Sequence, residues 1–301
     1  MTLATFLLQA FNGLSLFTVL LLMALGLAIV FGLMGVINMA HGELMAMGAY
    51  ATYATATVFE RFMPGAMELY FLVGIAVAFA VTFFFGWVME RGLIQFLYKR
   101  PLDTMLATWG LSLFLQQLFR HGFGPKEVTV PTVSWLQGAV EVAPDVSLPL
   151  SRLFIIGLAL VVTAAVYILL FRTRFGLRLR AVMQNRAMSG ATGINTERVD
   201  AMTFALGCGL AGIAGSSFTM LASTGPVTGQ QYIVDTFIVV VFGGVSSLLG
   251  TVLSSFFIAQ MQSTFEFFMS GSMAKAAILL LVIVVLYFRP SGLFAANVRR
   301  Q

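Results

Sequence analysis

Charged side chains are scarce in this 301-residue sequence: 17 Lys and Arg and 12 Asp and Glu amount to 10% of it, against 59% hydrophobic residues. A soluble protein of this length needs more charged surface to cover its core. The mean hydropathy of +0.95 therefore places the chain in a membrane and excludes soluble enzymes and nucleic-acid binders. In a membrane protein, the net charge of +5 is expected to lie in loops and to set the orientation.

Cysteine is nearly absent as well. The single Cys208 lies in an apolar, glycine-rich run, so it supports neither a disulfide framework nor a cysteine-based metal site, and we expect a small buried residue. The pattern His41-x-Glu43 also occurs in zinc deaminases, but those enzymes need further cysteine ligands. We therefore expect no metal site. No constellation of residues predicts an enzyme.

Two further features are missing. No Lys or Arg precedes Arg61, so the start lacks the charged region of a cleavable signal peptide, and we expect the apolar stretch 6–33 to remain as a membrane segment.

The chain also has no phosphate-binding G-x-x-x-x-G-K-[ST] sequence. If transport is driven by ATP, the motor must be a separate subunit.

Long apolar stretches fill most of the chain. A helix needs about 20 mostly apolar residues to cross the hydrocarbon core. Charged or proline-rich interruptions leave segments of that size, and they predict an all-α polytopic membrane protein of about 8 to 10 transmembrane helices, with residues 1–301 as one transmembrane domain. The predicted segments are 12–33, 42–59, 69–89, 104–120, 152–171, 201–222, 233–247, 250–268 and 274–289.

Positive charge gathers in three loops, which the positive-inside rule assigns to the cytoplasm together with the C-terminus. The number of membrane crossings between these loops agrees with this assignment only if 233–268 forms two short spans. The basic residues concerned are Arg91, Lys99 and Arg100, then Arg172, Arg174, Arg178, Arg180, Arg186 and Arg198, and finally Arg289, Arg299 and Arg300.

Glycine interrupts two apolar blocks, at 31–43 and at 242–250. Both stretches predict broken or re-entrant segments. Because one interruption falls in each half of the chain, the pattern is compatible with an internal duplication, in which substrate passes where unwound backbone and helix ends meet.

Polar groups inside apolar segments are costly unless they face protein or a water-filled cavity. This argument marks a candidate translocation pathway. The alternative for the first group is that Asn38 and His41 cap the break while Glu43 neutralises a neighbouring charge. For Asp235 the alternative is solvation at the membrane interface. The candidates are Asn38, His41, Glu43, Gln116, Gln117 and Asp235.

The cytoplasmic loop 171–200 is basic and amphipathic, and helical spacing of Leu177, Arg180, Ala181 and Gln184 predicts a helix over 177–189. Such a helix could lie on the membrane surface. The other interpretation is that it docks onto a partner protein.

Three stretches resemble a known family, the permease subunits of branched-chain amino-acid type ABC importers. They are Gly-Val-Ile-Asn-Met-Ala-His-Gly-Glu-Leu (35–44), Gly-Leu-Arg-Leu-Arg-Ala-Val-Met-Gln-Asn-Arg-Ala-Met (176–188) with Gly-Ile-Asn (193–195), and Arg-Pro-Ser-Gly-Leu-Phe (289–294). Part of the second stretch, Ser-Trp-Leu at 134–136 and Tyr-Ile-Val-Asp at 232–235 look most like the urea-transporting branch.

The resemblance implies a subunit of the bacterial inner membrane that pairs with a second, similar permease, two cytoplasmic ATPases and a periplasmic or lipid-anchored binding protein. ATP would be bound by the partner ATPases, and this chain would carry no cofactor. It also implies that the loop docks onto the ATPase, with coupling residues Arg180, Gln184, Asn185, Arg186 and Gly193.

The scarcity of charge inside the membrane favours a neutral solute such as urea, because an amino-acid zwitterion prefers compensating charges. Branched-chain or other amino acids remain the alternative substrates. A passive channel and an ion-coupled transporter that uses Glu43 or Asp235 are the rival classes.

Overall fold

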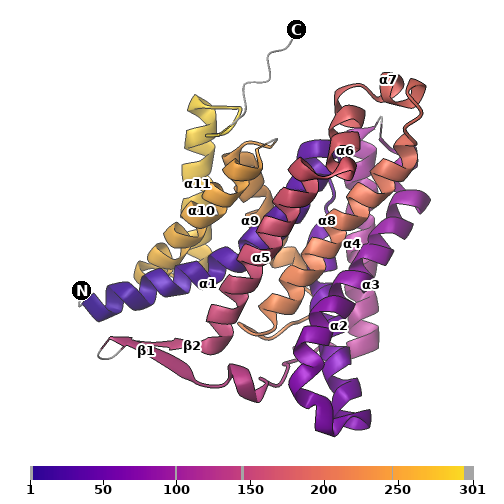
Figure 1. Ribbon diagram of the computed structural model, residues 1–301. Helices are drawn as coiled ribbons and strands as arrows, with labels where there is room; N and C mark the ends of the chain where they lie inside the picture. Colours follow the sequence, from indigo (N-terminus) through magenta and orange to yellow (C-terminus); the bar gives the residue numbers. More distant parts are fainter. Residues whose placement is uncertain (1–2, 99, 144–145, 246, 295–301) are drawn as a thin grey trace.

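The computed structural model describes residues 3–98, 100–143, 146–245 and 247–294. Helices dominate it (Figure 1). They are α1 (Leu3–Leu27), α2 (His41–Phe62), α3 (Tyr70–Gly92), α4 (Pro101–Phe123), α5 (Leu150–Arg172), α6 (Arg174–Gln184), α7 (Arg186–Ala191), α8 (Thr196–Phe218), α9 (Thr228–Gly243), α10 (Leu248–Phe268) and α11 (Gly271–Phe288).

Each predicted apolar segment overlaps one of these helices, so the prediction of an all-α polytopic membrane protein is confirmed. The ends differ by about five residues at most, except that α1 begins nine residues before the predicted segment 12–33 and continues into a π-helical turn. Within the described residues, five helices are long and apolar enough to cross a membrane: Leu7–Leu33, Pro64–Phe96, Leu150–Arg172, Thr196–Phe218 and Gly271–Phe288. Of the basic residues used to orient the chain, Lys99, Arg299 and Arg300 lie outside the described residues.

Small residues of α8 form the centre of the bundle, where α8 packs on α1, α2 and α3. A Cβ atom added at Gly215 would lie 1.9 Å from the backbone oxygen of Met45, and one added at Gly48 would lie 2.3 Å from that of Gly212. Helices approach this closely only through glycine. The glycine-rich run around Cys208 therefore serves packing, and Cys208 itself is fully buried, as expected.

The first predicted interruption is present. Helix α1 continues into a π-helical turn at Ala28–Leu33, and the chain then reverses through Gly35, whose φ of 70° suits glycine. Helix α2 begins at His41.

The second interruption separates α9 from α10. Helix α9 ends at Gly243, and Gly244 follows with a φ of 97°. The backbone N–H of Leu293 donates to the carbonyl oxygen of Phe242 at 2.9 Å, and that of Phe294 donates to Gly243 at 3.2 Å. The closing stretch 289–294 thus satisfies carbonyl groups that the end of α9 leaves free.

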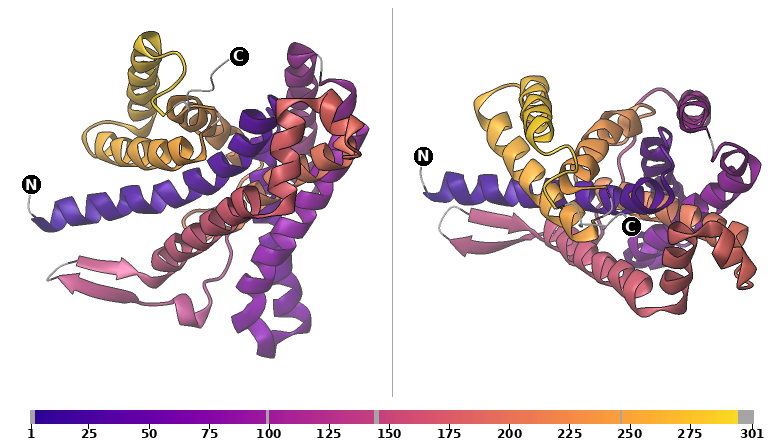
Figure 2. Two further views of the ribbon diagram at one scale, coloured as in Figure 1. Left: turned by 45° about the horizontal axis from the view of Figure 1, so that its top comes forward. Right: turned by 90° about the horizontal axis from the view of Figure 1, so that it is seen from above.

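A β-hairpin, β1 (Ala139–Ala143) paired antiparallel with β2 (Val146–Pro149), interrupts the loop between α4 and α5. It projects from the side of the molecule opposite α6 and α7 (Figures 1 and 2). Apolar periodicity gave no sign of it, because the strands are short and mostly exposed. The same loop is tied to the segment after α8 by a backbone bridge between Val128 and Thr224.

The predicted single helix over 177–189 is wrong, because α6 and α7 are separate helices that meet at Asn185. The side-chain oxygen of Asn185 accepts a hydrogen bond from the backbone N–H of Met188 at 3.0 Å, which caps the start of α7. Asparagine at this position favours a helix start over a helix interior.

Candidate functional site

Three of the predicted pathway residues lie together where α2 begins. Asn38, His41 and Glu43 are each 1% exposed or less. The Oδ1 atom of Asn38 accepts from the backbone N–H of Ala40 at 3.0 Å, so Asn38 stabilises the turn into α2. This bond lies within the turn itself, and Ala40, at the N-cap of α2, has no side-chain cap.

Glu43 connects α2 to α4. Its Oε1 atom accepts from the side-chain amide of Gln116 at 2.9 Å and from the hydroxyl of Ser112 at 3.2 Å. One turn earlier on α4, the hydroxyl of Thr108 accepts from the backbone N–H of Met39 at 3.0 Å. Thr108, Ser112 and Gln116 recur every four residues and so form one polar stripe on α4.

His41 faces the other way, toward α1. Its Nε2 atom lies 3.2 Å from the backbone oxygen of Met23. The ring is also close to Gly26, where an added Cβ atom would lie 3.1 Å from it. The start of α2 is therefore a polar junction between α1 and α4, and we call the set Asn38, His41, Glu43, Ser112 and Gln116 the polar junction.

The other two predicted pathway residues lie elsewhere. Gln117 is exposed on α4, beside the buried Gln116. Asp235 is on α9, where its Oδ2 atom lies 2.6 Å from the ammonium nitrogen of Lys275 on α11. That ammonium also lies 5.4 Å from the ring centroid of Tyr232. Asp235 is thus neutralised by an ion pair between two helices.

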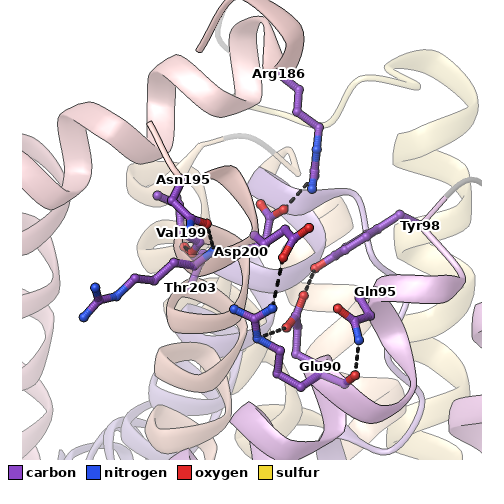
Figure 3. Close-up of polar contacts among 11 residues, drawn as sticks. Glu90, Gln95, Tyr98, Arg186, Asn195, Val199, Asp200 and Thr203 are labelled. Atoms are coloured by element: carbon purple, nitrogen blue, oxygen red, sulfur yellow. Dashed lines mark hydrogen bonds and ion pairs between the residues drawn. The ribbon is translucent and has the colours of Figure 1, made fainter. Parts of the chain in front are cut away.

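A second cluster joins the loop to the bundle (Figure 3). The guanidinium of Arg186, at the start of α7, lies 2.6 Å from the carboxylate of Asp200 on α8, and its carbon lies 5.5 Å from the ring centroid of Tyr98. The hydroxyl of Tyr98 donates to Glu90 on α3 at 2.8 Å. Burial raises the pKa of Tyr98, so its hydroxyl stays protonated and remains a donor.

Arg91 extends this cluster along α3. Its side chain lies 3.9 Å from Glu90 and 3.2 Å from Glu197 in the first turn of α8. Glu90 and Asp200 are each 1% exposed, so two buried acids are compensated by arginines and a tyrosine. We call Glu90, Arg91, Tyr98, Arg186, Glu197 and Asp200 the loop anchor. It holds α7 to both α3 and α8.

The remaining coupling candidates occupy different positions. Arg180 donates to the backbone oxygen of Leu170 and lies 5.4 Å from the ring centroid of Phe171, so it holds α6 against the end of α5. Gln184 and Asn185 are exposed. Gly193 is exposed in the turn before α8, with a φ of 85°, and borders a groove of about 570 Å³ that also includes Arg178 and Arg198.

Sequence reasoning missed Ser112, Glu90, Tyr98 and Asp200. A spacing of four from Gln116 could have indicated Ser112. Glu90 and Asp200 stand at the edges of apolar segments, where an acid is usually solvated. Their burial depends on Arg186 and Tyr98, which are distant in the sequence.

The helical bundle, with its buried polar junction and its anchored basic loop, defines a polytopic membrane permease. A family model described as "Branched-chain amino acid transport system / permease component" matches residues 9–286. The chain belongs to this family of ABC transport permeases, and it is a transport subunit, not an enzyme.

Curated relatives match along nearly their whole length. The permease protein LivH of a high-affinity branched-chain amino acid transport system in Salmonella typhimurium is 26% identical over 96% of this chain and 95% of its own length. The corresponding protein BraD of Pseudomonas aeruginosa is 28% identical over 95% and 94%. A probable branched-chain amino acid permease protein, LivH of Methanocaldococcus jannaschii, is 25% identical over 91% and 88%. No solved structure gives a significant match.

Proposed function

We propose that this chain forms, with a second homologous permease, the translocation pathway of an ATP-driven importer of small polar solutes. Two cytoplasmic ATPases supply the energy, and a periplasmic or lipid-anchored protein delivers the solute. The Arg186–Asp200 ion pair carries the proposal, because it joins a loop helix to the central helix α8. A passive channel has no need of such a connection.

The loop transmits force in this scheme. When the ATPases close, they move the surface formed by Gln184, Asn185 and Gly193, which are exposed. The loop anchor passes this movement to α3 and α8, and Arg180 passes it to α5. Because α8 packs on α1 and α2, movement of α8 reaches the polar junction.

The pathway lies along the polar junction. Its buried amide, hydroxyl and carboxyl groups replace water around a solute, and one face of α4 lines it through Ser112 and Gln116. Asp235 and Gln117 contribute polar groups at the ends of this pathway. Asp235 lies beside a cavity of about 600 Å³ between α9 and α11.

Urea is the first candidate substrate, because the resemblance of 232–235 and of the loop to the urea-transporting branch favours it. Amide and hydroxyl groups match its hydrogen-bonding pattern. Branched-chain amino acids are the second candidate, favoured by the printed names of the relatives. Uptake of labelled urea and of labelled leucine by cells that carry the complete operon distinguishes the two.

We further propose that the chain resides in a bacterial inner membrane with the basic loop and the C-terminus in the cytoplasm. The positive charge of α6 and α7 supports this orientation. The end of α11 lies on the same side of the molecule as α7 (Figure 1).

Reconstitution tests the proposal. Proteoliposomes that contain all subunits should accumulate solute only with ATP, and liposomes with this chain alone should show neither uphill transport nor rapid flux. Uphill transport by the chain alone in a proton or sodium gradient would establish an ion-coupled transporter. Rapid downhill flux would establish a channel.

A further inference from the structure

A polar cavity of about 530 Å³ opens at the end of α8 that lies farthest from α6 and α7. Helices α1, α5, α8, α9 and α10 contribute to its wall. The candidate pathway residues predicted from sequence do not line it. In the proposed orientation, this cavity opens to the side from which solute is delivered.

Arg152 contributes a positive charge to the cavity. Its guanidinium donates to the side-chain oxygen of Asn12 and lies 6.0 Å from the ring centroid of Phe11, so α1 holds it in place. A guanidinium has five N–H donors. The bond to Asn12 therefore leaves donors for a ligand.

Glu266, near the end of α10, contributes a negative charge. Its Oε1 atom accepts from the side-chain amide of Gln262 at 2.9 Å, which leaves further acceptor positions on the carboxylate. In the part of the chain that the structure describes, Glu266 and Arg152 form no ion pair with each other or with a third residue. Two opposite charges thus border one cavity without neutralising each other.

We propose that this cavity is a binding site for a neutral solute with a carbonyl or carboxylate oxygen at one end and an amino group at the other. Arg152 donates to the oxygen, and Glu266 accepts from the N–H groups. Urea and amino-acid zwitterions share this chemistry. An ion of a single charge would leave one of the two side chains without a partner.

The position of the cavity connects it to the polar junction. Val19, in its wall, is four residues from Met23, whose backbone oxygen contacts His41. Tyr232 is also in the wall, and its backbone oxygen accepts a hydrogen bond from the hydroxyl of Thr236. That hydroxyl lies 3.7 Å from the sulfur of Met23. A solute in the cavity is thus next to the proposed pathway, on which this inference rests.

Thiol protection tests the site in the complete transporter, without the binding protein. Ala222 is exposed in the cavity wall, and the one natural cysteine, Cys208, is 0% exposed. Ala222→Cys therefore introduces the one reactive thiol of this chain, and labelling is measured on this chain by mass spectrometry. Urea or leucine at twice its dissociation constant should slow labelling by a methanethiosulfonate about threefold, since labelling falls as 1/(1 + [L]/Kd).

Three comparisons make the result specific. Acetate, with a single charge, should protect poorly. Val140→Cys on the exposed hairpin should be labelled at the same rate with and without solute. Arg152→Gln and Glu266→Gln, each added to Ala222→Cys, should abolish protection while the melting temperature of the complex stays unchanged.

Protection by urea but not leucine identifies a urea site, and the converse identifies a zwitterion site. Protection that survives both substitutions, or no protection by either solute in a complex that still transports with ATP, overturns the site but not the proposed function. Failure of ATP-driven uptake by the unmodified complex instead overturns the proposed function.

Discussion

The guanidinium of Arg186 and the carboxylate of Asp200 lie 2.6 Å apart, although the Arg186 side chain is 49% exposed and the Asp200 side chain is 1% exposed. One partner thus belongs to the loop surface and the other to the interior of the bundle. The pair therefore joins the start of α7 directly to α8.

Arg186→Gln should lower substrate-stimulated ATP hydrolysis by the assembled complex. It leaves Asp200 buried without its cation, which costs about 3–5 kcal/mol for a fully buried pair and less here, since half of Arg186 is exposed. Membrane insertion should be unaffected, and Arg186→Glu should have a larger effect because it places a second acid beside Asp200. Measurements of ATPase activity with saturating binding protein check both variants.

The matched controls for this pair are Arg174→Gln and the double variant Arg186→Gln with Asp200→Asn. Arg174 is exposed and forms no ion pair within the described chain, so its loss should leave coupling intact. The double variant should recover thermal stability without recovering coupling. Full coupling in Arg186→Gln would remove the residue from force transmission.

Gln116→Met should lower the melting temperature, whereas Gln117→Met should not, and Gln116→Met should reduce transport more strongly than Gln117→Met. Both residues are glutamines on α4, but one donates to Glu43 and the other is exposed. Loss of one hydrogen bond to a buried carboxyl group costs about 1–3 kcal/mol. Labelled-solute uptake and thermal unfolding in detergent measure the two effects. Equal behaviour of the two variants would contradict the assignment of the polar junction.

Gly215→Ala should destabilise the bundle by about 1–3 kcal/mol, because the added methyl group overpacks the contact between α2 and α8. Its nearest neighbour would be a backbone oxygen, which no side-chain rotation can move. Gly157→Ala on α5 is the control, since no atom lies within 4 Å of its added Cβ. A lower melting temperature only in Gly215→Ala is the expected result, and equal melting temperatures would refute the close packing.

Single cysteines on opposite sides should establish the orientation. Val140, on the hairpin, is 44% exposed and Leu177, on α6, is 62% exposed. A membrane-impermeant maleimide should label Val140→Cys in intact spheroplasts and Leu177→Cys only in inverted vesicles. The opposite pattern would reverse the proposed topology.

Sequence predicted the number and the approximate ends of the long helices because apolar length is a local property of the chain. It also located both interruptions, since Gly35 and Gly244 adopt conformations that other residues avoid. The hairpin and the division of the loop at Asn185 escaped it, because both depend on a few residues without apolar periodicity.

The sites were predictable only in part, for a physical reason. Asn38, His41 and Glu43 stand close in the sequence, so their cluster could be predicted, whereas the partners of Arg186 come from α3 and α8. Asp235 was predicted as a pathway residue, whereas its ion pair with Lys275 joins residues that are 40 positions apart and could not be predicted. Pairing between helices has no signature in a single sequence.

The donation from Leu293 and Phe294 to the end of α9 limits where the chain can be shortened or fused to a tag. Deletion from Gly292 onward would strip two carbonyl oxygens of their donors in an apolar surrounding, at a cost of several kcal/mol for each. A purification handle should therefore follow Phe294, and cleavage before Leu293 should weaken the end of α9.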